Sequence, residues 1–381
     1  MPDNRKPETK PVYQFEAYLS LDDAELTSRI ERVKRDMGPR LLVLGHHYQR
    51  DAVIALSDLR GDSYKLAALA ASDQRCEAIA FCGVHFMSET ADILANRPER
   101  LAARDGRRVP VSLPDLAAGC SLADMANIEQ VEACWTQLGE VIDTGDLLPV
   151  TYVNSTAALK AFCGRHGGIV CTSSNARAVM DWAFARRSRV LFFPDQHLAR
   201  NTARAMGIPL EQMPLWDPAA GALGGNSADA IQQSRVILWK GLCSVHQVFQ
   251  PEHVARFRAA HPEGHVMVHP ECPMDVVDEA DLAGSTAAII EAVEQSPAGT
   301  HWGIGTEVNL VQRLKAQHPE QHVEFLANAD GLCPTMYRID LPHLCWAVEN
   351  LAAGTPVNVI TVEPETAEHA LLALQRMLEV R

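Results

Sequence analysis

Three similar cysteine-containing turns, spread along the 381-residue chain, constrain its organisation most. The cysteines are Cys120, Cys243 and Cys333, and they lie 123 and 90 residues apart. Each follows a glycine by one or two residues and directly precedes a serine or a proline. A glycine lets the backbone turn tightly or approach a bulky group closely. The recurrence predicts a threefold internal repeat and, as a working hypothesis, three thiolates that converge on one metal centre.

Short apolar runs alternate with helical segments along the chain, which is typical of parallel sheets covered by helices. Strands that are buried on both faces of a parallel sheet are continuous apolar runs. The expected strands are, in chain order, 41–45, 78–82, 109–113, 148–154, 168–171, 190–193, 236–239, 265–271, 301–306 and 323–326. The sequence therefore predicts an α/β protein of three similar, Rossmann-like αβα domains with parallel sheets.

The repeats also set the expected domain boundaries. An N-terminal arm with a helix is expected at 1–36, and closing helices are expected at 346–381. The three αβα repeats are expected at 37–138, 139–260 and 261–345. Residues 208–227 are rich in Pro, Gly and Ala, and we expect them to form an inserted surface loop.

Composition excludes several classes of function. The formal net charge of −14 disfavours a nucleic-acid binder, because such binding depends on clustered Lys and Arg. The polar start lacks an apolar signal core and no apolar run approaches a membrane span, so we expect a cytoplasmic protein without a membrane partner. Its ten cysteines are then expected to be reduced. No Cys-x-x-Cys pair occurs, so a metal site must combine distant parts of the chain.

Polar side chains end the first strand of each expected repeat. Because ligands of parallel sheets bind at the carboxyl ends of the strands, these groups meet around one pocket if the repeats face a common axis. The pairs are His46 with Tyr48, Tyr152 with Asn154, and His269 with Glu271.

Hydroxyl side chains recur at the expected helix starts. A hydroxyl there can serve only as a helix cap, but a helix N-terminus also offers free N–H groups that bind a carboxylate or a phosphate. These hydroxyls belong to Ser88, Ser173 and Thr286 at matching positions, and to Ser63, which follows Asp62 at a further helix start.

A single cysteine or histidine is more often a buried structural residue than a ligand, so recurrence at matched positions is what favours a site here. Three thiolates fit a [4Fe-4S] cluster with one open iron that acts as a Lewis acid toward a hydroxyl or a carboxylate. A zinc site with three cysteines and a water is the alternative. The other seven cysteines lack the glycine-containing turn, and most of them are expected to pack in the core.

With these residues, the chain resembles the quinolinate synthase family of iron-sulfur enzymes from about residue 40 to the C-terminus. The resemblance rests on an ordered set of motifs. They are His46-His47-Tyr48-Gln49, Gly61-Asp62-Ser63, and the segments 83–91, 152–156, 171–175, 194–198, 239–246, 269–271 and 284–286.

The resemblance implies three αβα domains around a pseudo-threefold axis, with a [4Fe-4S] cluster and the substrate at the centre. It implies condensation of iminosuccinate (iminoaspartate) with dihydroxyacetone phosphate to quinolinate, with loss of phosphate and water, in de novo NAD biosynthesis. The enzyme that supplies iminosuccinate is an expected partner. By motif match, Cys120, Cys243 and Cys333 hold the cluster. The implied substrate-binding residues are His46, Ser63, Tyr152, Val153, Asn154, Ser173, His269, Pro270, Glu271 and Thr286.

Catalytic roles follow from the same match as hypotheses. Glu271 is expected to act as general base and acid, Tyr48 and Tyr152 to assist proton transfer, and His46 to belong to the same catalytic set. Some family members carry Cys-x-x-Cys-x-x-Cys near the last ligand, whereas Cys333 stands alone before Pro334, so we expect no regulatory thiol pair there.

Two other functions stay open at this point. One is an aconitase-like iron-sulfur hydro-lyase that acts on a hydroxy acid, and the other is a non-enzymatic iron-sulfur redox sensor. The segment 208–227 and His47 receive no role.

Overall fold

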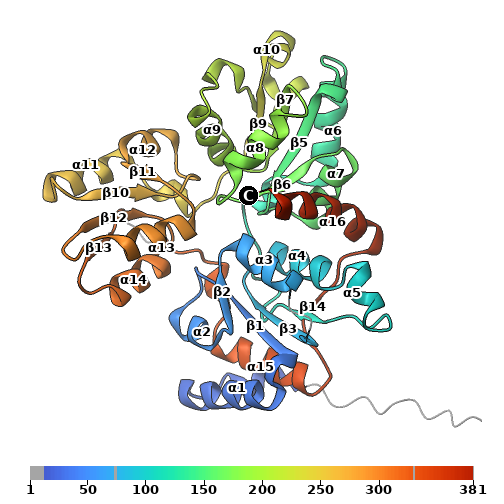
Figure 1. The fold of residues 1–381 in the computed structure, drawn as a ribbon, viewed down its shortest axis with the longest axis vertical. Helices are drawn as coiled ribbons and strands as arrows, with labels where there is room; N and C mark the ends of the chain where they lie inside the picture. Colours follow the sequence, from blue (N-terminus) through green and yellow to red (C-terminus); the bar gives the residue numbers. More distant parts are fainter. Residues whose placement is uncertain (1–12, 73–74, 329–330, 381) are drawn as a thin grey trace, which may run out of the picture.

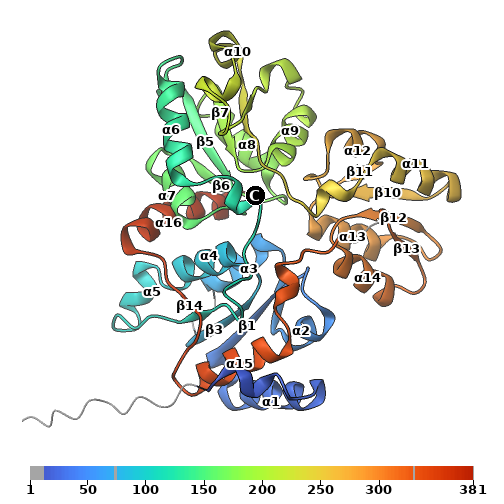
Figure 2. The same ribbon diagram turned by 180° about the vertical axis from the view of Figure 1, so that it is seen from behind.

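The computed structural model describes residues 13–72, 75–328 and 331–380. Its helices and strands form three lobes around a common centre, and the opposite view shows the same three lobes (Figures 1 and 2). Each lobe contains one sheet whose strand pairs are parallel, apart from a single antiparallel pair in the first sheet. The predicted α/β class is thereby confirmed, while the pseudo-threefold axis stays a prediction.

The first lobe is built on a five-stranded sheet in the order β14-β4-β3-β1-β2. Its strands are β1 (Leu41–His46), β2 (Leu59–Gly61), β3 (Ala78–Cys82), β4 (Val111–Ser112) and β14 (Val359–Ile360). The helices of this part are α1 (Asp23–Met37), α2 (Asp51–Leu56), α3 (Ser63–Ser72), α4 (His85–Ala95), α5 (Pro98–Ala102) and α15 (Leu341–Ala352). Every residue of β1 and β3 is buried, as expected of central strands covered on both faces.

The second lobe has a five-stranded, all-parallel sheet in the order β6-β5-β7-β9-β8. Its strands are β5 (Leu147–Tyr152), β6 (Ile169–Cys171), β7 (Arg189–Phe193), β8 (Leu215–Trp216) and β9 (Val236–Trp239). Its helices are α6 (Ile128–Gly139), α7 (Ala157–Arg165), α8 (Ala176–Phe184), α9 (Gln196–Ala205) and α10 (Ala228–Gln233). The C-terminal helix α16 (Pro364–Glu379) packs against α7 and β6 of this lobe.

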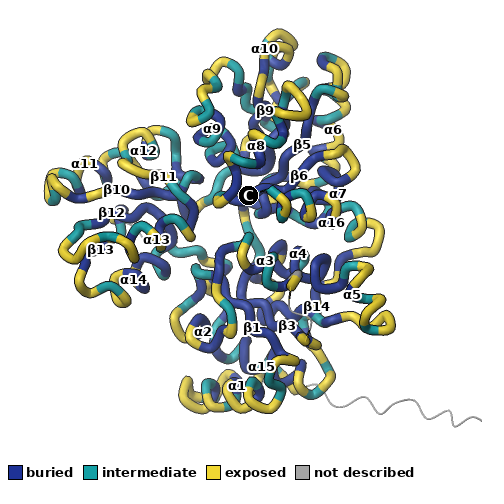
Figure 3. Tube along the Cα trace, viewed as in Figure 1, coloured by how far each residue is buried: buried dark blue, intermediate teal, exposed yellow. Residues whose placement is uncertain are grey.

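The third lobe has a four-stranded parallel sheet in the order β11-β10-β12-β13. Its strands are β10 (His265–Val268), β11 (Leu282–Ala283), β12 (His301–Gly305) and β13 (His322–Phe325). Its helices are α11 (Pro251–Ala260), α12 (Met274–Glu279), α13 (Thr286–Gln295) and α14 (Val308–Gln317). Figure 3 shows the sheets as the buried part of each lobe, with exposed residues on outer helices such as α1 and α10.

Two segments differ from the sequence-based expectation. Residues 208–227 do not form only a surface loop, because Leu215–Trp216 is strand β8, which pairs with β9 at the sheet edge, and Trp216 is buried. The pattern was missed because a two-residue strand among prolines and glycines has no periodicity of its own. The closing segment also contributes to two lobes, since β14 pairs with β4 while α16 covers α7. The predicted domain boundaries stay predictions.

The N-terminal arm is described only from residue 13 onward. Part of the arm is not extended, because Phe15–Tyr18 forms a 3-10 helix. The buried Tyr18 hydroxyl donates to Glu349 of α15 at 2.5 Å. Among the described residues, no helix combines the length and the apolar character that crossing a membrane requires.

Asp92 of α4 connects the end of its own helix to two distant segments of the first lobe. Its carboxylate accepts hydrogen bonds from Arg108 at 2.6 and 2.7 Å, from Asn96 at 2.8 Å and from the Val362 backbone at 2.9 Å. Because it is almost fully buried, Asp92→Ala leaves these donors without their partner. We expect a loss of about 2–3 kcal/mol in the free energy of unfolding, measured by denaturant titration. In the control Asp181→Ala, which removes an exposed ion pair with Arg177, we expect a change of about 0.5 kcal/mol or less.

Candidate active site

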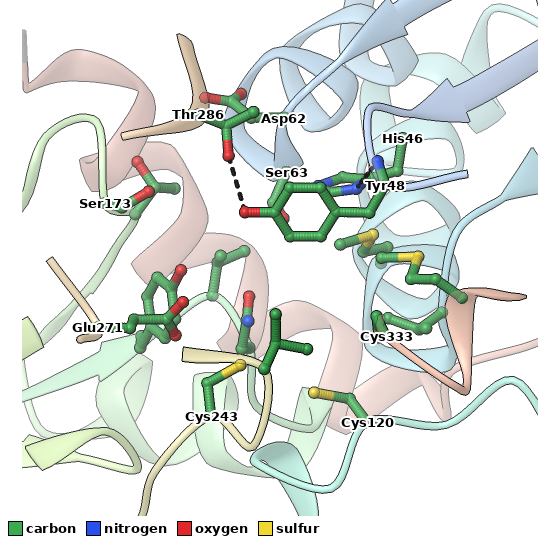
Figure 4. A pocket seen from close by; sticks show the side chains of 18 of the residues that line it. His46, Tyr48, Asp62, Ser63, Cys120, Ser173, Cys243, Glu271, Thr286 and Cys333 are labelled. Atoms are coloured by element: carbon green, nitrogen blue, oxygen red, sulfur yellow. Dashed lines mark hydrogen bonds between the residues drawn. The ribbon is translucent and has the colours of Figure 1, made fainter. Parts of the chain in front are cut away.

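One pocket lies where the three lobes meet, and side chains from all three lobes line it (Figure 4). Its wall contains every catalytic, substrate-binding and metal-binding residue implied by the family resemblance except Pro270. These residues are His46, Tyr48, Ser63, Cys120, Tyr152, Val153, Asn154, Ser173, Cys243, His269, Glu271, Thr286 and Cys333. Their assembly is a structural observation, whereas their individual roles stay proposals.

The carboxyl ends of the first strands bring the polar pairs to this pocket. Strand β1 ends at His46, β5 ends at Tyr152, and His269 directly follows β10. Since all three sheets are parallel around these strands, the strands deliver their last residues to one edge of each sheet, and the three edges face the centre.

The helix starts confirm part of the expectation. Ser63 is the first residue of α3, and Thr286 is the first residue of α13, capped by Ser285. Ser173 lies in the loop before α8, which begins at Ala176, yet Ser173 still lines the pocket. Ser88 does not match these positions, because it lies one turn inside α4, is fully buried and does not line the pocket. The helix begins earlier, at His85, than the sequence suggested.

A chain of hydroxyl groups, which begins with Tyr48 at the pocket wall, links the first and third lobes. The Tyr48 hydroxyl lies 3.0 Å from the Thr286 hydroxyl and 3.0 Å from the Thr306 hydroxyl. Thr306 lies in turn 3.3 Å from Nε2 of His246. Burial raises the pKa of Tyr48 and that of Tyr152, so both phenols are neutral and able to donate a hydrogen bond.

The carboxylate of Glu271 lies beside the Nδ1 atoms of two stacked imidazoles. Its Oε2 lies 3.1 Å from Nδ1 of His246 and 3.2 Å from Nδ1 of His269, and the two rings stack with their centroids 4.4 Å apart. Burial raises the pKa of Glu271, while it lowers the pKa of His246 and of His269 to about 3. Both imidazoles are therefore neutral near pH 7. The buried Oε1 has no hydrogen-bond partner among the described residues, which leaves it for a ligand in the pocket.

His46 belongs to the first lobe, whereas Glu271 belongs to the third. Burial, with smaller contributions from His47 and Arg313, lowers the pKa of His46 to about 3. Its Nδ1 accepts a hydrogen bond from the Tyr48 backbone at 3.2 Å, so Nε2 carries the proton of the neutral ring. His46 can thus donate a hydrogen bond to a ligand without carrying a charge.

The three cysteines of the recurring turns approach one another from three loops. They follow β4, β9 and β13, and Figure 4 shows their side chains at the same side of the pocket. All ten cysteines lie in the described part of the chain, and only these three are partly exposed. Burial raises the pKa of Cys120, and the neighbouring Cys333 raises it further. Neighbouring thiolates repel one another because they carry the same negative charge. A soft metal centre fits three such sulfur donors, since its positive charge offsets this repulsion.

His246, for which the sequence predicted no role, also lines the pocket. The ligand atoms of Cys243, His246 and Glu271 all lie within 4.8 Å of one another and form a group that could hold a metal ion. The sequence did contain a signal, because His246 follows Cys243 by three residues within the motif 239–246. That signal did not show which residues the imidazole of His246 contacts. The other wall residues without an assigned role are Asp62, Tyr64, Val84, Phe86, Met87, Thr172, Val245, Thr335 and Met336.

Asp62 joins the first two lobes beside the pocket. Its Oδ1 accepts from the Lys65 backbone at 2.8 Å, which caps α3, and its Oδ2 accepts from the Ser174 hydroxyl at 2.8 Å. The N-terminus of α3 and the loop that carries Ser173 are therefore held next to each other.

Fold and site together define a class: an α/β protein in which three partly exposed cysteines and buried acid-base groups share one central pocket. The family model described as Quinolinate synthetase A protein matches residues 28–379. The quinolinate synthase of Rhodopirellula baltica is 62% identical over 374 residues, covering 98% of this chain and 95% of the relative. That of Corynebacterium glutamicum is 52% identical (96% and 90% covered), and that of Anoxybacillus flavithermus is 52% identical (95% and 95%). The chain belongs to the quinolinate synthetase A family, which confirms the resemblance seen in the sequence.

Proposed function

We propose that this chain is a quinolinate synthase, a transferase of de novo NAD biosynthesis. It condenses iminosuccinate (iminoaspartate) with dihydroxyacetone phosphate to quinolinate and releases phosphate and water. Family membership over nearly the whole chain supports this function and does not favour the hydro-lyase or the redox sensor. The observation that carries the proposal is the juxtaposition, in one central pocket, of three partly exposed cysteines and the buried carboxyl group of Glu271.

We further propose that Cys120, Cys243 and Cys333 hold one [4Fe-4S] cluster per chain. A single zinc ion with bonds of about 2.3 Å would bring its sulfurs to about 3.8 Å from one another. Among the described residues, the three cysteines do not form a group whose sulfurs all lie within 4.8 Å. This spacing supports a larger inorganic group. When bound, a cluster with one iron free of cysteine supplies a Lewis acid toward a hydroxyl group of the substrate.

The residues opposite the cysteines are suited to bind two anionic substrates. Ser63 and Thr286 begin helices of ten residues, where the free backbone N–H groups and the helix dipole stabilise carboxylate or phosphate oxygens. Asn154 and Ser173 add an amide and a hydroxyl from the second lobe, and Val153 also lines the wall. Pro270 does not line the pocket, and we propose only an indirect contribution through its backbone.

Glu271 is the proposed base and acid of the proton shifts. Its free Oε1 takes a proton from the bound substrate and returns it to a leaving hydroxyl group, while Oε2 stays beside two neutral imidazoles. Tyr48 and Tyr152 assist as neutral phenol donors, and His46 and His269 donate hydrogen bonds without adding charge. The walls exclude water, because each of these side chains except that of Tyr48 is nearly fully buried.

The proposed setting is the cytoplasm, where ten unpaired thiols stay reduced. The enzyme that supplies iminosuccinate is the proposed partner, because an imine of this kind hydrolyses in water and is best consumed near its source. The formal charge of −14 supports the expectation that no nucleic acid is bound.

The test is anaerobic purification with iron and sulfide analysis, followed by an assay for quinolinate from iminosuccinate and dihydroxyacetone phosphate. The expected result is about four irons per chain and a pyridine dicarboxylate product that absorbs in the ultraviolet. A bound cluster without quinolinate would overturn the proposed reaction but keep the metal site. Zinc in place of iron would overturn the cluster.

A further inference from the structure

Asn201 ties the loop that carries Glu271 to a helix of a different lobe. It lies on α9 of the second lobe and is buried, with 8% of its surface exposed. Its Nδ2 donates one hydrogen bond to the carbonyl of Pro270 at 2.9 Å and another to the carbonyl of Cys272 at 3.0 Å. The two acceptors are the residues directly before and directly after Glu271.

Both protons of the Asn201 amide are therefore used on the same short loop. Two fixed carbonyls hold the peptide groups on either side of Glu271, so the backbone that carries this side chain is held in part from outside its own lobe. Within the third lobe, the loop is anchored at its start by the His269 N–H, which donates to Gly305 at 2.9 Å, and by the Cys272 N–H, which donates to His269 at 3.0 Å. Asn201 adds the contact that comes from the second lobe.

The oxygen of the same amide strengthens this argument. Oδ1 of Asn201 is buried, and no described residue donates to it. The side chain is thus oriented by its two donated bonds alone, and a carboxylate of the same size at this position would direct an oxygen at two carbonyl oxygens. The contact depends on a donor, which an aspartate lacks.

A second contact joins the same two lobes without reaching the loop. Arg204, one turn further along α9, forms an ion pair of 2.7 Å with Asp278 of α12. Both side chains are about one third exposed or more, so the pair is solvated and contributes little to stability. Arg204 therefore offers a matched control, since it tests the packing of α9 on the third lobe and leaves the carbonyls of Pro270 and Cys272 in place.

We propose that Asn201 is a positioning residue for Glu271, an inference that rests on the proposed function. Asn201 does not line the pocket, and its hydrogen bonds reach only the backbone that carries the carboxyl group. A displacement of a reacting group by about 1 Å can lower a rate roughly 100-fold, even when its cause lies away from the chemistry. Substrate binding to the hydroxyl groups on the other walls does not depend on this contact.

The experiment compares Asn201→Asp, Asn201→Ala and Arg204→Ala with the unchanged protein, each purified anaerobically with its metal. Thermal unfolding and metal per chain are measured first, and kcat and KM for both substrates are then expressed per loaded site. We expect either Asn201 variant to lower kcat about 10- to 100-fold with KM within about threefold. Arg204→Ala is expected to keep kcat within about twofold. If the aspartate variant does not fold, the kinetics of Asn201→Ala alone test the inference.

Several outcomes would overturn the inference. Unchanged kcat in a folded, metal-loaded Asn201 variant would show that the loop holds Glu271 without help. An equal loss in Arg204→Ala would assign the effect to the whole interface. A loss of metal or of stability that accounts for the lost rate would assign Asn201 a purely structural role. An unchanged protein that makes no quinolinate would instead overturn the proposed function, before any variant is compared.

Discussion

Replacing Glu271 with glutamine is expected to lower kcat for quinolinate formation by roughly 10²- to 10⁴-fold, the range that a general base contributes. Glutamine keeps the size and the polar contacts of the side chain but cannot take up a proton. The cysteines are untouched, so iron and sulfide per chain are expected to stay at the level of the unchanged protein. Steady-state kinetics together with metal analysis check both parts of this result.

The matched control is Glu291→Gln, on the exposed surface of α13 in the same lobe. We expect it to retain full activity. If Glu271→Gln retained substantial activity, or if both variants lost it equally, Glu271 would have no role as the base.

The same carboxyl group determines the expected pH dependence. Burial raises the pKa of Glu271, so the group becomes protonated at a higher pH than an ordinary carboxyl group. The base works only when it is deprotonated, and we therefore expect kcat to fall on the acid side at a pH above the usual carboxyl range. The effect of pH on stability has the opposite direction. The contribution of the Glu271 carboxyl group to the free energy of unfolding is present at low pH and is lost as the pH rises through the folded-state pKa.

The second large effect is expected from Cys243→Ser, which should remove most of the iron and sulfide and with them all measurable turnover. Cys243 is partly exposed, and its neighbours include Cys120, Cys333 and Glu271. Soft thiolate ligands favour iron-sulfur centres, and the hydroxyl of serine is a hard, much more basic ligand. Metal analysis and visible absorption spectra measure the loss directly.

Cys345→Ala is the control for this experiment, because Cys345 is a buried thiol in α15, outside the pocket wall. It should keep the full metal content and activity. A Cys243→Ser protein with unchanged iron would contradict the proposed ligand set, and a loss of iron in Cys345→Ala would show that the metal depends on general stability.

The sequence by itself determined the local elements and predicted most of the residues that line the central pocket. Continuous apolar runs such as 41–45 and 236–239 form buried strands in any context that covers both faces. Polar residues placed directly after such strands, such as Tyr152 and His269, then lie at the carboxyl edge of a parallel sheet. Because a similar turn precedes Cys120, Cys243 and Cys333, the sequence also predicted that these three cysteines lie around one common centre.

Only the tertiary structure decided which groups from different lobes touch. Nothing near His246 in the sequence shows that its ring stacks on His269 and faces Glu271, because that contact joins two separate sheets. The two hydrogen bonds of Asn201 and the pairing of β8 likewise depend on partners far along the chain. Periodicity reports how a segment meets its immediate surroundings, whereas a contact between lobes depends on how the whole chain packs, and this packing fixed the geometry of the site.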